Sequence, residues 1–387
     1  MYKILTLNNI SVAGLERLPR DKYEVASEIQ HPDAILLRSF KMHDMEIPDT
    51  LKAVGRAGAG VNNIPIDKMS QRGIPVFNAP GANSNAVKEL VIAGMLLASR
   101  NICQAWDYTN KLEGDDASLS KLVEAGKKKY AGFELPGRTI GVVGLGAIGI
   151  RVANIALSMG MKVIGYDPQI TVKSAWQLAA DVEQAHSVDD MVSRCDFITF
   201  HVPLVDATRN MLSAERVAMM KKGAVVLNFA RDGIVDEAAV CQALDADKLY
   251  AYVTDFPSNS LKGHDKVIAL PHLGASTGEA EDNCAIMVAD QVKDFLENGN
   301  IVNAVNFPEV VMPRGEGNRL AIANSNVPNM VGQISTALAD AGLNIIDMLN
   351  KSRGELAYTL VDVEGTIPET LIARIKTISG VLSVRIL

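Results

Sequence analysis

A glycine-rich turn at residues 144–149 constrains the fold of this chain more than any other feature. The turn reads G-L-G-A-I-G and follows an apolar run at 139–143 that is typical of a buried strand. A helical pattern follows it, which completes the context that a pyrophosphate-binding turn requires. The first glycine permits the tight turn, the second lets the backbone approach a pyrophosphate, and the third allows close packing of helix on strand. We therefore expect a dinucleotide to bind at Gly144, Gly146, Ala147, Ile148 and Gly149.

The residue that ends the next predicted strand indicates which dinucleotide is bound. Asp167 follows the apolar run at 162–166, about 20 residues after the turn, where a carboxylate accepts hydrogen bonds from ribose hydroxyls. No Arg stands at 168 or 169, where a 2′-phosphate would require one. A turn that merely joins strand to helix is the alternative, but strand, helix and Asp167 together weigh against it. The sequence favours NAD over NADP.

The segments around this turn predict an α/β fold with a doubly wound parallel sheet of the Rossmann type. Helical stretches separate a series of short apolar runs, and that alternation is typical of such sheets. Beyond 139–143 and 162–166, these runs lie at 197–201, 224–228, 250–254 and 267–270. Residues 1–95 alternate in the same way on a smaller scale and predict a second parallel-sheet domain.

Two further segments complete the predicted architecture. A long helical pattern covers 279–297 and ends at Asn298 and Gly299, which form a helix stop signal. A linker rich in Pro and Gly follows, and residues 318–387 then show the element order βαββαβ. This order is typical of a ferredoxin-like domain.

Composition and charge limit the classes of partner. With 387 residues, 48% of them apolar, the chain can bury a large core, and its net charge of −7 argues against nucleic acid and anionic membrane surfaces as partners. The four cysteines are isolated and lack metal-ligand spacing, so no metal site is expected. The N-terminus lacks the apolar region of a signal peptide, and no apolar run is long enough for a membrane span. We expect a cytoplasmic protein with a small-molecule substrate.

Two candidate catalytic residues stand directly after predicted strands. Arg231 follows the strand at 224–228, and His272 follows the strand at 267–270. The carboxyl ends of strands in an open parallel sheet are where ligands bind. Arg pairs with a carboxylate in bidentate fashion, and His accepts a hydroxyl proton as hydride leaves. Taken alone, each residue has an ordinary structural interpretation. Arg231 could form a surface ion pair, and His272 could be a histidine of the core. Together, behind a dinucleotide turn, they indicate oxidation of a 2-hydroxy acid.

Several motifs resemble the D-isomer-specific 2-hydroxyacid dehydrogenases over nearly the whole chain. They are L-R-S at 37–39, G-R-A-G-A-G-V-N-N at 55–63, N-A-P-G-A-N-S at 78–84 and P-H-L-G-A-S-T at 271–277. The resemblance implies a flavodoxin-like substrate domain formed by 1–95 and 279–307, interrupted by an NAD-binding domain at 96–278. It also implies that residues 318–387 form an ACT-like regulatory domain.

The resemblance further implies the roles of individual residues. It is greatest to the members that oxidise 3-phospho-D-glycerate to 3-phosphohydroxypyruvate, the first step of L-serine biosynthesis. Arg231 would anchor the carboxylate and His272 would act as acid and base. Arg38 and Arg56, with Ala59 and Gly60, would hold the substrate, although Arg56 has the alternative role of supporting the loop at 58–60. The residues implied on the nicotinamide and ribose side are Val202, Pro203, Phe229, Ala230, Asp255 and Ala275.

One position departs from the family pattern. In the family, a catalytic Glu that orients the His follows the residue equivalent to Asp255 at a fixed spacing. In this chain that position is occupied by Ser260. A serine can hydrogen-bond an imidazole but cannot stabilise its cationic form as a carboxylate would. Two alternatives therefore stay open. One is another D-2-hydroxyacid dehydrogenase of the hydroxypyruvate or glyoxylate reductase type, and the other is a catalytically weak NAD-dependent sensor.

The ACT-like domain implies a regulatory ligand and self-association. By resemblance, polar residues at Asn326 and Asn344 would bind L-serine between two paired domains, in a homodimer or homotetramer. Asn324 and Asn329 stand where a His and a Gly are more usual in that motif. A dimerisation domain without a ligand is the alternative.

Overall fold

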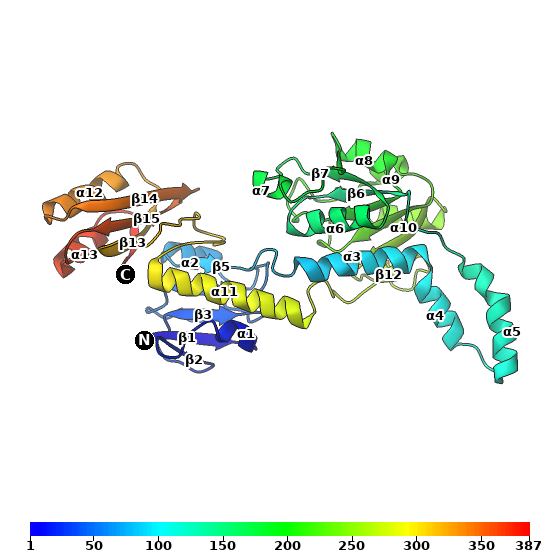
Figure 1. Cartoon of the computed structure of the whole chain (residues 1–387), viewed down its shortest axis with the longest axis horizontal. Helices are drawn as coiled ribbons and strands as arrows, with labels where there is room; N and C mark the ends of the chain where they lie inside the picture. The colour runs from blue at the N-terminus through cyan, green and yellow to red at the C-terminus, as the bar shows by residue number, and fades with distance from the viewer. The chain divides into compact units, whose positions relative to one another are not determined.

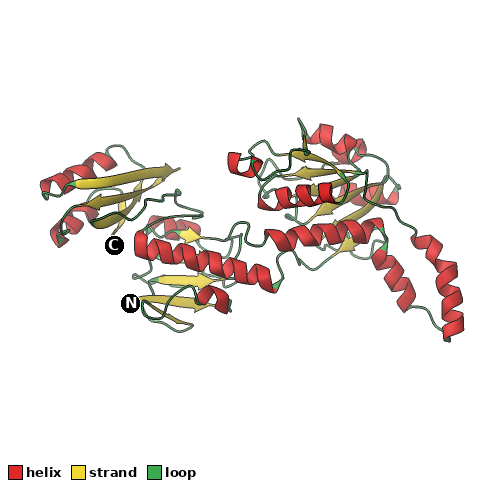
Figure 2. Cartoon of the chain, in the orientation of Figure 1, coloured by secondary structure: helices red, strands yellow, loops and turns green.

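The computed structural model describes all 387 residues and divides into two compact units. One comprises residues 1–83 and 277–387, and the other comprises residues 84–276 (Figure 1). Helices and strands alternate in both, as Figure 2 shows, which confirms the α/β class. No helix is both long and apolar enough to cross a membrane.

The unit formed by residues 84–276 is built on a seven-stranded sheet in the order β12-β11-β10-β9-β6-β7-β8. All of its strand pairs are parallel. The order reverses at β6, as in a doubly wound sheet. The central strands β9 and β10 are buried throughout because both faces of the sheet are covered. The strands are β6 (Thr139–Val143), β7 (Lys162–Tyr166), β8 (Glu183–Gln184), β9 (Phe197–Phe200), β10 (Ala224–Asn228), β11 (Leu249–Thr254) and β12 (Val267–Ala269).

Helices cover both faces of this sheet. On one face α3 (Ser84–Ser99) packs on α6 (Ala147–Ser158). Helix α3 buries apolar residues against β10 and β11, and α6 buries apolar residues against β6 and β7. The other face is covered by α8 (Val188–Arg194), α9 (Ala214–Met219) and α10 (Glu237–Asp245). The remaining helices are α4 (Ile102–Asn110), α5 (Asp116–Gly126), η1 (Lys127–Tyr130) and α7 (Val172–Ala175).

The other unit begins with a five-stranded parallel sheet in the order β2-β1-β3-β4-β5, which is the flavodoxin-like order. Its strands are β1 (Tyr2–Leu7), β2 (Tyr23–Ala26), β3 (Ala34–Leu37), β4 (Ala53–Arg56) and β5 (Val76–Phe77), and its first helices are α1 (Val12–Leu15) and α2 (Ile66–Gln71). The long helix α11 (Gly278–Asn298), yellow in Figure 1, returns to this sheet and buries Val288 and Val292 against it. The domain is therefore discontinuous in sequence.

The boundary between the two units differs from the expected position. The sequence pattern puts it between residues 95 and 96, whereas the compact units divide between Asn83 and Ser84. The whole of α3 belongs with the seven-stranded sheet because Val87, Val91 and Met95 are buried in its core.

The C-terminal residues form an antiparallel sheet in the order β14-β15-β13-β16, with two helices on one face. Their element order is βαββαβ: β13 (Asn318–Ser325), α12 (Met330–Asp340), β14 (Ile345–Arg353), β15 (Leu356–Val363), α13 (Glu369–Lys376) and β16 (Val381–Ile386). This confirms the ferredoxin-like expectation. On the other face, Ala321, Tyr358 and Leu360 join the same core as Phe295 of α11.

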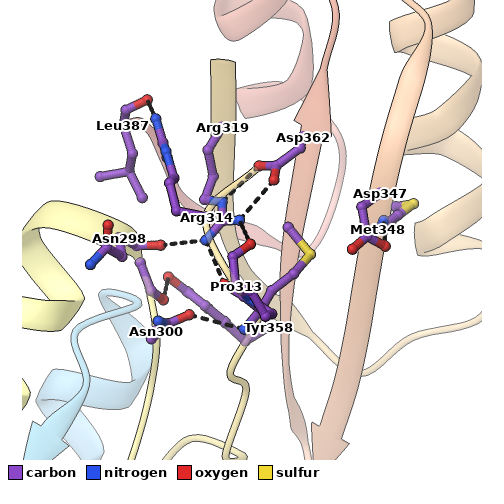
Figure 3. Close-up of polar contacts among 12 residues, drawn as sticks. Asn298, Asn300, Pro313, Arg314, Arg319, Asp347, Met348, Tyr358, Asp362 and Leu387 are labelled. Atoms are coloured by element: carbon purple, nitrogen blue, oxygen red, sulfur yellow. Dashed lines mark hydrogen bonds and ion pairs between the residues drawn. The ribbon is translucent and has the colours of Figure 1, made fainter. Parts of the chain in front are cut away.

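A buried ion pair fixes the C-terminal sheet to the end of α11 (Figure 3). Arg319, which is fully buried, binds both carboxylate oxygens of Asp362 at 2.7 Å. Its remaining donors reach three carbonyls, those of Asn298, Met312 and Pro313. Tyr358 donates to the carbonyl of Gly299, directly after the helix. Because a helix C-terminus carries partial negative charge, the guanidinium stabilises it.

Candidate active site

The glycine-rich turn has the local geometry that a bound pyrophosphate requires. Gly144 has a φ of +89°, and a Cβ there would lie 2.6 Å from the carbonyl oxygen of His201. A Cβ at Gly149 would collide with the carbonyl of Gly144, so both positions need glycine. Around Gly146, which caps α6, there is open space. The first N–H groups of α6 lack intrahelical partners, so this open side fits an anion.

Asp167 lies at the rim of that turn. Its two carboxylate oxygens accept from the backbone N–H groups of Leu145, at 2.8 Å, and Gln169, at 2.9 Å. These contacts orient the carboxylate and leave lone pairs for further donors. The side chain is therefore held beside the glycine turn in a position that fits ribose hydroxyls.

His272 lies in a loop that is fixed by two hydrogen bonds to Asp255. The backbone N–H of His272 donates to the carbonyl of Asp255 at 3.0 Å, and the N–H of Gly274 donates to Asp255 Oδ2 at 3.0 Å. His272 has a φ of +48°, a conformation that these bonds support. Phe256 meets the imidazole ring edge-on, with 5.0 Å between ring centroids. Asp255 and Phe256, which directly follow β11, thus fix the loop that carries His272.

Asp255 is a buried carboxyl with one unsatisfied oxygen. Its side chain is 1% exposed, and Oδ1 has no hydrogen-bond partner. Burial raises the pKa of the Asp255 carboxyl, and the Gly274 N–H and the charges of His272 and Arg231 act in the opposite direction. Both Arg231 and His272 therefore act electrostatically on this one carboxyl.

Arg231 is exposed directly after β10 and forms no ion pair. Its Nη1 donates to the carbonyl of Ala230 at 2.6 Å. Asn228 fixes the loop, because its side chain donates to the carbonyl of Arg231 and accepts from the N–H of Ala230. An exposed guanidinium on a fixed loop, with no ion pair, is suited to an anionic ligand.

Ser260 forms no hydrogen bond with His272. The hydroxyls of Ser260 and Ser258 both lie within donating distance of Glu237 Oε2, at 3.2 Å and 2.7 Å. The two hydroxyl oxygens are 2.8 Å apart, so the Ser260 hydrogen can alternatively be donated to Ser258. The ring of His272 forms no hydrogen bond with any side chain. Sequence reasoning missed both Glu237 as the partner of Ser260 and Asp255 as the support of the His272 loop. Only the position of Asp255 at a strand end pointed to the second.

The other residues expected on the cofactor side follow the ends of β9 and β10 or the His272 loop. Val202 lies next to the turn, since a Cβ at Gly144 would come within 2.8 Å of its Cγ1, and Pro203 follows it. Phe229 and Ala230 are buried after β10, and the ring of Phe229 packs against Gly94 of α3. Ala275 follows Gly274.

The residues expected to hold the substrate lie in the five-stranded unit. Arg38 Nη1 pairs with Glu281 Oε1 on α11 at 2.7 Å, and both side chains are partly exposed. Arg56 donates from Nε to the carbonyl of Arg38 at 3.1 Å and packs against Gly58, where a Cβ would collide with it. The loop containing Ala59 and Gly60 is also held by Asn78, which donates to the Ala59 carbonyl at 2.6 Å. Arg56 thus contacts the loop it was alternatively expected to support.

The two asparagines expected to bind an amino acid lie at turns of the C-terminal domain. Asn326 donates from its side chain to the carbonyl of Gly354 at 3.0 Å. Asn344 is exposed, and its carbonyl accepts from the N–H of Glu364 at 3.0 Å. The neighbouring Asn324 is buried with its Oδ1 unpaired.

Comparison with known proteins adds to this geometry. Residues 92–274 match the model of a family described as D-isomer specific 2-hydroxyacid dehydrogenase, NAD binding domain. The chain is 36% identical over 374 residues to D-3-phosphoglycerate dehydrogenase of Methanocaldococcus jannaschii, covering 93% of this chain and 68% of that protein. It is 34% identical over 355 residues to D-3-phosphoglycerate dehydrogenase of Haemophilus influenzae, covering 89% and 83%.

Solved structures agree with the fold. The 3-phosphoglycerate dehydrogenase of Entamoeba histolytica with bound NAD⁺ is 27% identical, with a TM-score of 0.61 over 79% of this chain and 98% of that one. D-2-hydroxyisocaproate dehydrogenase is 23% identical, with a TM-score of 0.64 over 79% and 99%, and shows the fold alone. The expectation of an NAD-binding domain is confirmed.

Proposed function

Since the chain belongs to the D-isomer-specific 2-hydroxyacid dehydrogenases and carries their NAD-binding domain, we propose that it oxidises 3-phospho-D-glycerate to 3-phosphohydroxypyruvate. This reaction would be the first step of L-serine biosynthesis. The observation that carries the proposal is the identity of 36% to a D-3-phosphoglycerate dehydrogenase across 93% of the chain. The electrostatic action of both Arg231 and His272 on one buried carboxyl supports it.

Arg231 and His272 would have separate roles at the reacting carbon, in substrate binding and in proton transfer. Bound NAD supplies the acceptor for the hydride that leaves C2 of the substrate. Arg231, exposed and without an ion pair, would pair with the C1 carboxylate. His272 would accept the C2 hydroxyl proton in oxidation and return it in reduction. Because the His272 loop is fixed by Asp255 and Phe256, little reorganisation would be needed to place the ring.

The residues around the glycine turn fit NAD. The open side of Gly146 and the free N–H groups of α6 suit the pyrophosphate, and Asp167 suits the adenosine ribose. The buried and unsatisfied Asp255 Oδ1 suits an N–H donor such as the nicotinamide carboxamide. A 2′-phosphate would bring negative charge against the Asp167 carboxylate, so NADH is expected to be preferred to NADPH.

Arg38 would bind the substrate phosphate. Its present partner is a partly exposed carboxylate, and exposed ion pairs contribute only about 0–1 kcal/mol. A phosphate can therefore compete for this guanidinium. Arg56 would act mainly on the loop of Ala59 and Gly60, since it packs against Gly58.

The main experiment is steady-state NADH oxidation with 3-phosphohydroxypyruvate, hydroxypyruvate and glyoxylate at equal concentrations. We expect the highest kcat/KM with the phosphorylated ketoacid. Greater efficiency with hydroxypyruvate or glyoxylate would replace the proposal by a reductase of unphosphorylated acids.

One observation favours a catalytically weak NAD-dependent sensor, namely that no carboxylate bonds to the His272 ring. Binding of NADH without turnover of any of the three would support that alternative.

The C-terminal domain would bind L-serine and join copies of the chain. Asn326 and Asn344 are the expected contacts for the amino acid. Strand β14 forms one edge of its sheet and is mostly exposed, so it can pair with the same strand of a second copy. We expect a homodimer or a homotetramer, which light scattering would measure.

A further inference from the structure

A cavity of about 590 Å³ lies between the C-terminal sheet domain and the five-stranded sheet domain. Both domains belong to the unit formed by residues 1–83 and 277–387. One wall comes from the loop before β4 and the end of α2, and the other from β16 and α13. Phe295, in the last turn of α11, lies in the lining. The volume is in the range of small-molecule sites.

The lining of this cavity is basic in a chain that is acidic overall. Lys52, Arg72, Lys376 and Arg385 line it, against Asp49 as the one carboxylate. Lys52 is paired with Asp33 at 2.7 Å, and Arg72 is paired with Asp49 at 2.9 Å. Lys376 and Arg385 form no ion pair, and the charge of Asp33 acts on Arg385 only through space.

Arg385 is held rigidly with one donor group unused. Its Nη2 donates to the carbonyls of Phe295 and Leu296 at 3.0 Å, and its guanidinium stacks on the Phe295 ring at 4.3 Å. Nη1 is buried and has no hydrogen-bond partner. An unmade hydrogen bond of a buried charged group costs free energy, so this donor favours an acceptor that enters from the cavity.

Lys376 faces the same cavity from the last residue of α13. It is exposed and forms no hydrogen bond or ion pair, so it can move toward a ligand without losing a contact. The neighbouring polar groups of Thr50, Gln71 and Ser383 can complete the coordination of oxygen atoms. Two positive charges without an ion pair suit a dianion.

We propose that this cavity is a binding site for a phosphate group, either free phosphate or a small phosphate monoester, held by Arg385 and Lys376. It is distinct from the site of Arg231 and His272 and does not depend on the proposed reaction. The phosphate would connect the C-terminal domain to the five-stranded domain beside the end of α11. Lys52 and Arg72 would add to the positive field around it.

Isothermal titration of the full chain with inorganic phosphate tests this site. Because Arg38 is also proposed to bind phosphate, the titration is made in the Arg38→Ala variant. We expect binding there at millimolar phosphate, and about tenfold weaker binding when Lys376→Met is added, as for a lost charge-assisted hydrogen bond. The matched control is Lys351→Met, which removes an exposed lysine of β14 outside the cavity and should leave binding unchanged.

The outcomes separate this site from the substrate site. Arg385→Met should abolish binding, but Arg385 also bonds to α11, so the exposed Lys376 gives the decisive variant. Loss of all phosphate binding in Arg38→Ala, or equal binding with and without Lys376→Met, would overturn the proposal. Titration with glycerol 3-phosphate distinguishes a phosphate monoester from free phosphate as the ligand of this site. Tighter binding than inorganic phosphate identifies a monoester site, and weaker binding identifies a site for free phosphate.

Discussion

The hydroxyl of Ser260 donates to Glu237 Oε2 at 3.2 Å, at the position where the family pattern leads one to expect a carboxylate beside His272. Ser258 donates to the same oxygen, so the Glu237 carboxylate organises this loop. A Glu introduced at position 260 would therefore meet the negative charge of Glu237. The charge of Glu237 must therefore be removed when a Glu is introduced at position 260.

We predict that Ser260→Glu combined with Glu237→Gln raises kcat for carbonyl reduction and shifts its basic pH limb upward by about 1–3 units. Ser260→Glu alone should give a smaller gain, because repulsion from Glu237 turns the new carboxylate away. Glu237→Gln alone is the control. If the double variant is no faster than the native chain at any pH, the new acid does not serve His272.

The second prediction concerns cofactor preference. Asp167→Ala removes a carboxylate that accepts from the N–H groups of Leu145 and Gln169, and with it the repulsion of a 2′-phosphate. The ratio of kcat/KM for NADH to that for NADPH should fall, mainly through weaker NADH binding. Asp181→Ala, a change at an exposed carboxylate outside this contact, is the control. Equal efficiency with both cofactors in the native chain would contradict the assigned role of Asp167.

The sequence predicted the elements of the fold well because their patterns are local. The apolar run at 139–143, the glycines and the helix that follows lie together in the chain, so the dinucleotide turn could be recognised directly. The same holds for the βαββαβ order of residues 318–387. The position of α3 could not be predicted in this way. Its buried residues contact α6 and β10, which lie far along the chain.

The candidate site was only partly predictable for the same reason. Arg231 and His272 follow strands that can be recognised from sequence, so their position at the carboxyl edge of the sheet could be expected. The hydrogen bond from Ser260 to Glu237 joins two loops, and the pair of Arg38 and Glu281 joins a strand end to α11. Side-chain partners of this kind depend on tertiary packing and leave no periodic signal.

The third prediction concerns substrate charge. Arg38→Ala should raise the KM for 3-phosphohydroxypyruvate by the loss of a charge-assisted contact of about 1.5–3 kcal/mol. The KM for unphosphorylated hydroxypyruvate should change little. Glu281→Gln frees Arg38 from its ion pair and should lower the KM for the phosphorylated substrate alone. Equal loss on both substrates in Arg38→Ala would instead assign Arg38 a structural role.

The fourth prediction concerns the C-terminal domain. L-serine should raise the melting temperature of the native chain through preferential binding to the folded state. Asn344→Ala removes an exposed side chain and should abolish the shift without lowering the melting temperature itself. D-serine is the control for stereospecific binding. If L-serine leaves the melting temperature unchanged, the domain serves association alone.

The last prediction concerns His201, which follows β9 beside the glycine turn. Its Nδ1 is buried without a partner, its Nε2 lies 3.1 Å from Thr199 Oγ1, and burial lowers the pKa of the ring to about 3. The unfolded chain binds this proton near the ordinary pKa of about 6.5. The folded state therefore carries the neutral ring, and the resulting stability is present above pH 6.5 and is lost as pH falls toward 3.

This difference should appear in the pH dependence of unfolding. The free energy of unfolding should fall below pH 6.5 with a contribution from His201 of up to about 1.4 kcal/mol per pH unit. His201→Gln keeps polar atoms but binds no proton, so its unfolding free energy should depend less steeply on pH between 6.5 and 4. His31→Gln, a change at an exposed histidine, should retain the native slope. Urea unfolding midpoints across this range measure the effect, and identical slopes for native and His201→Gln chains would mean that the ring takes up its proton without unfolding.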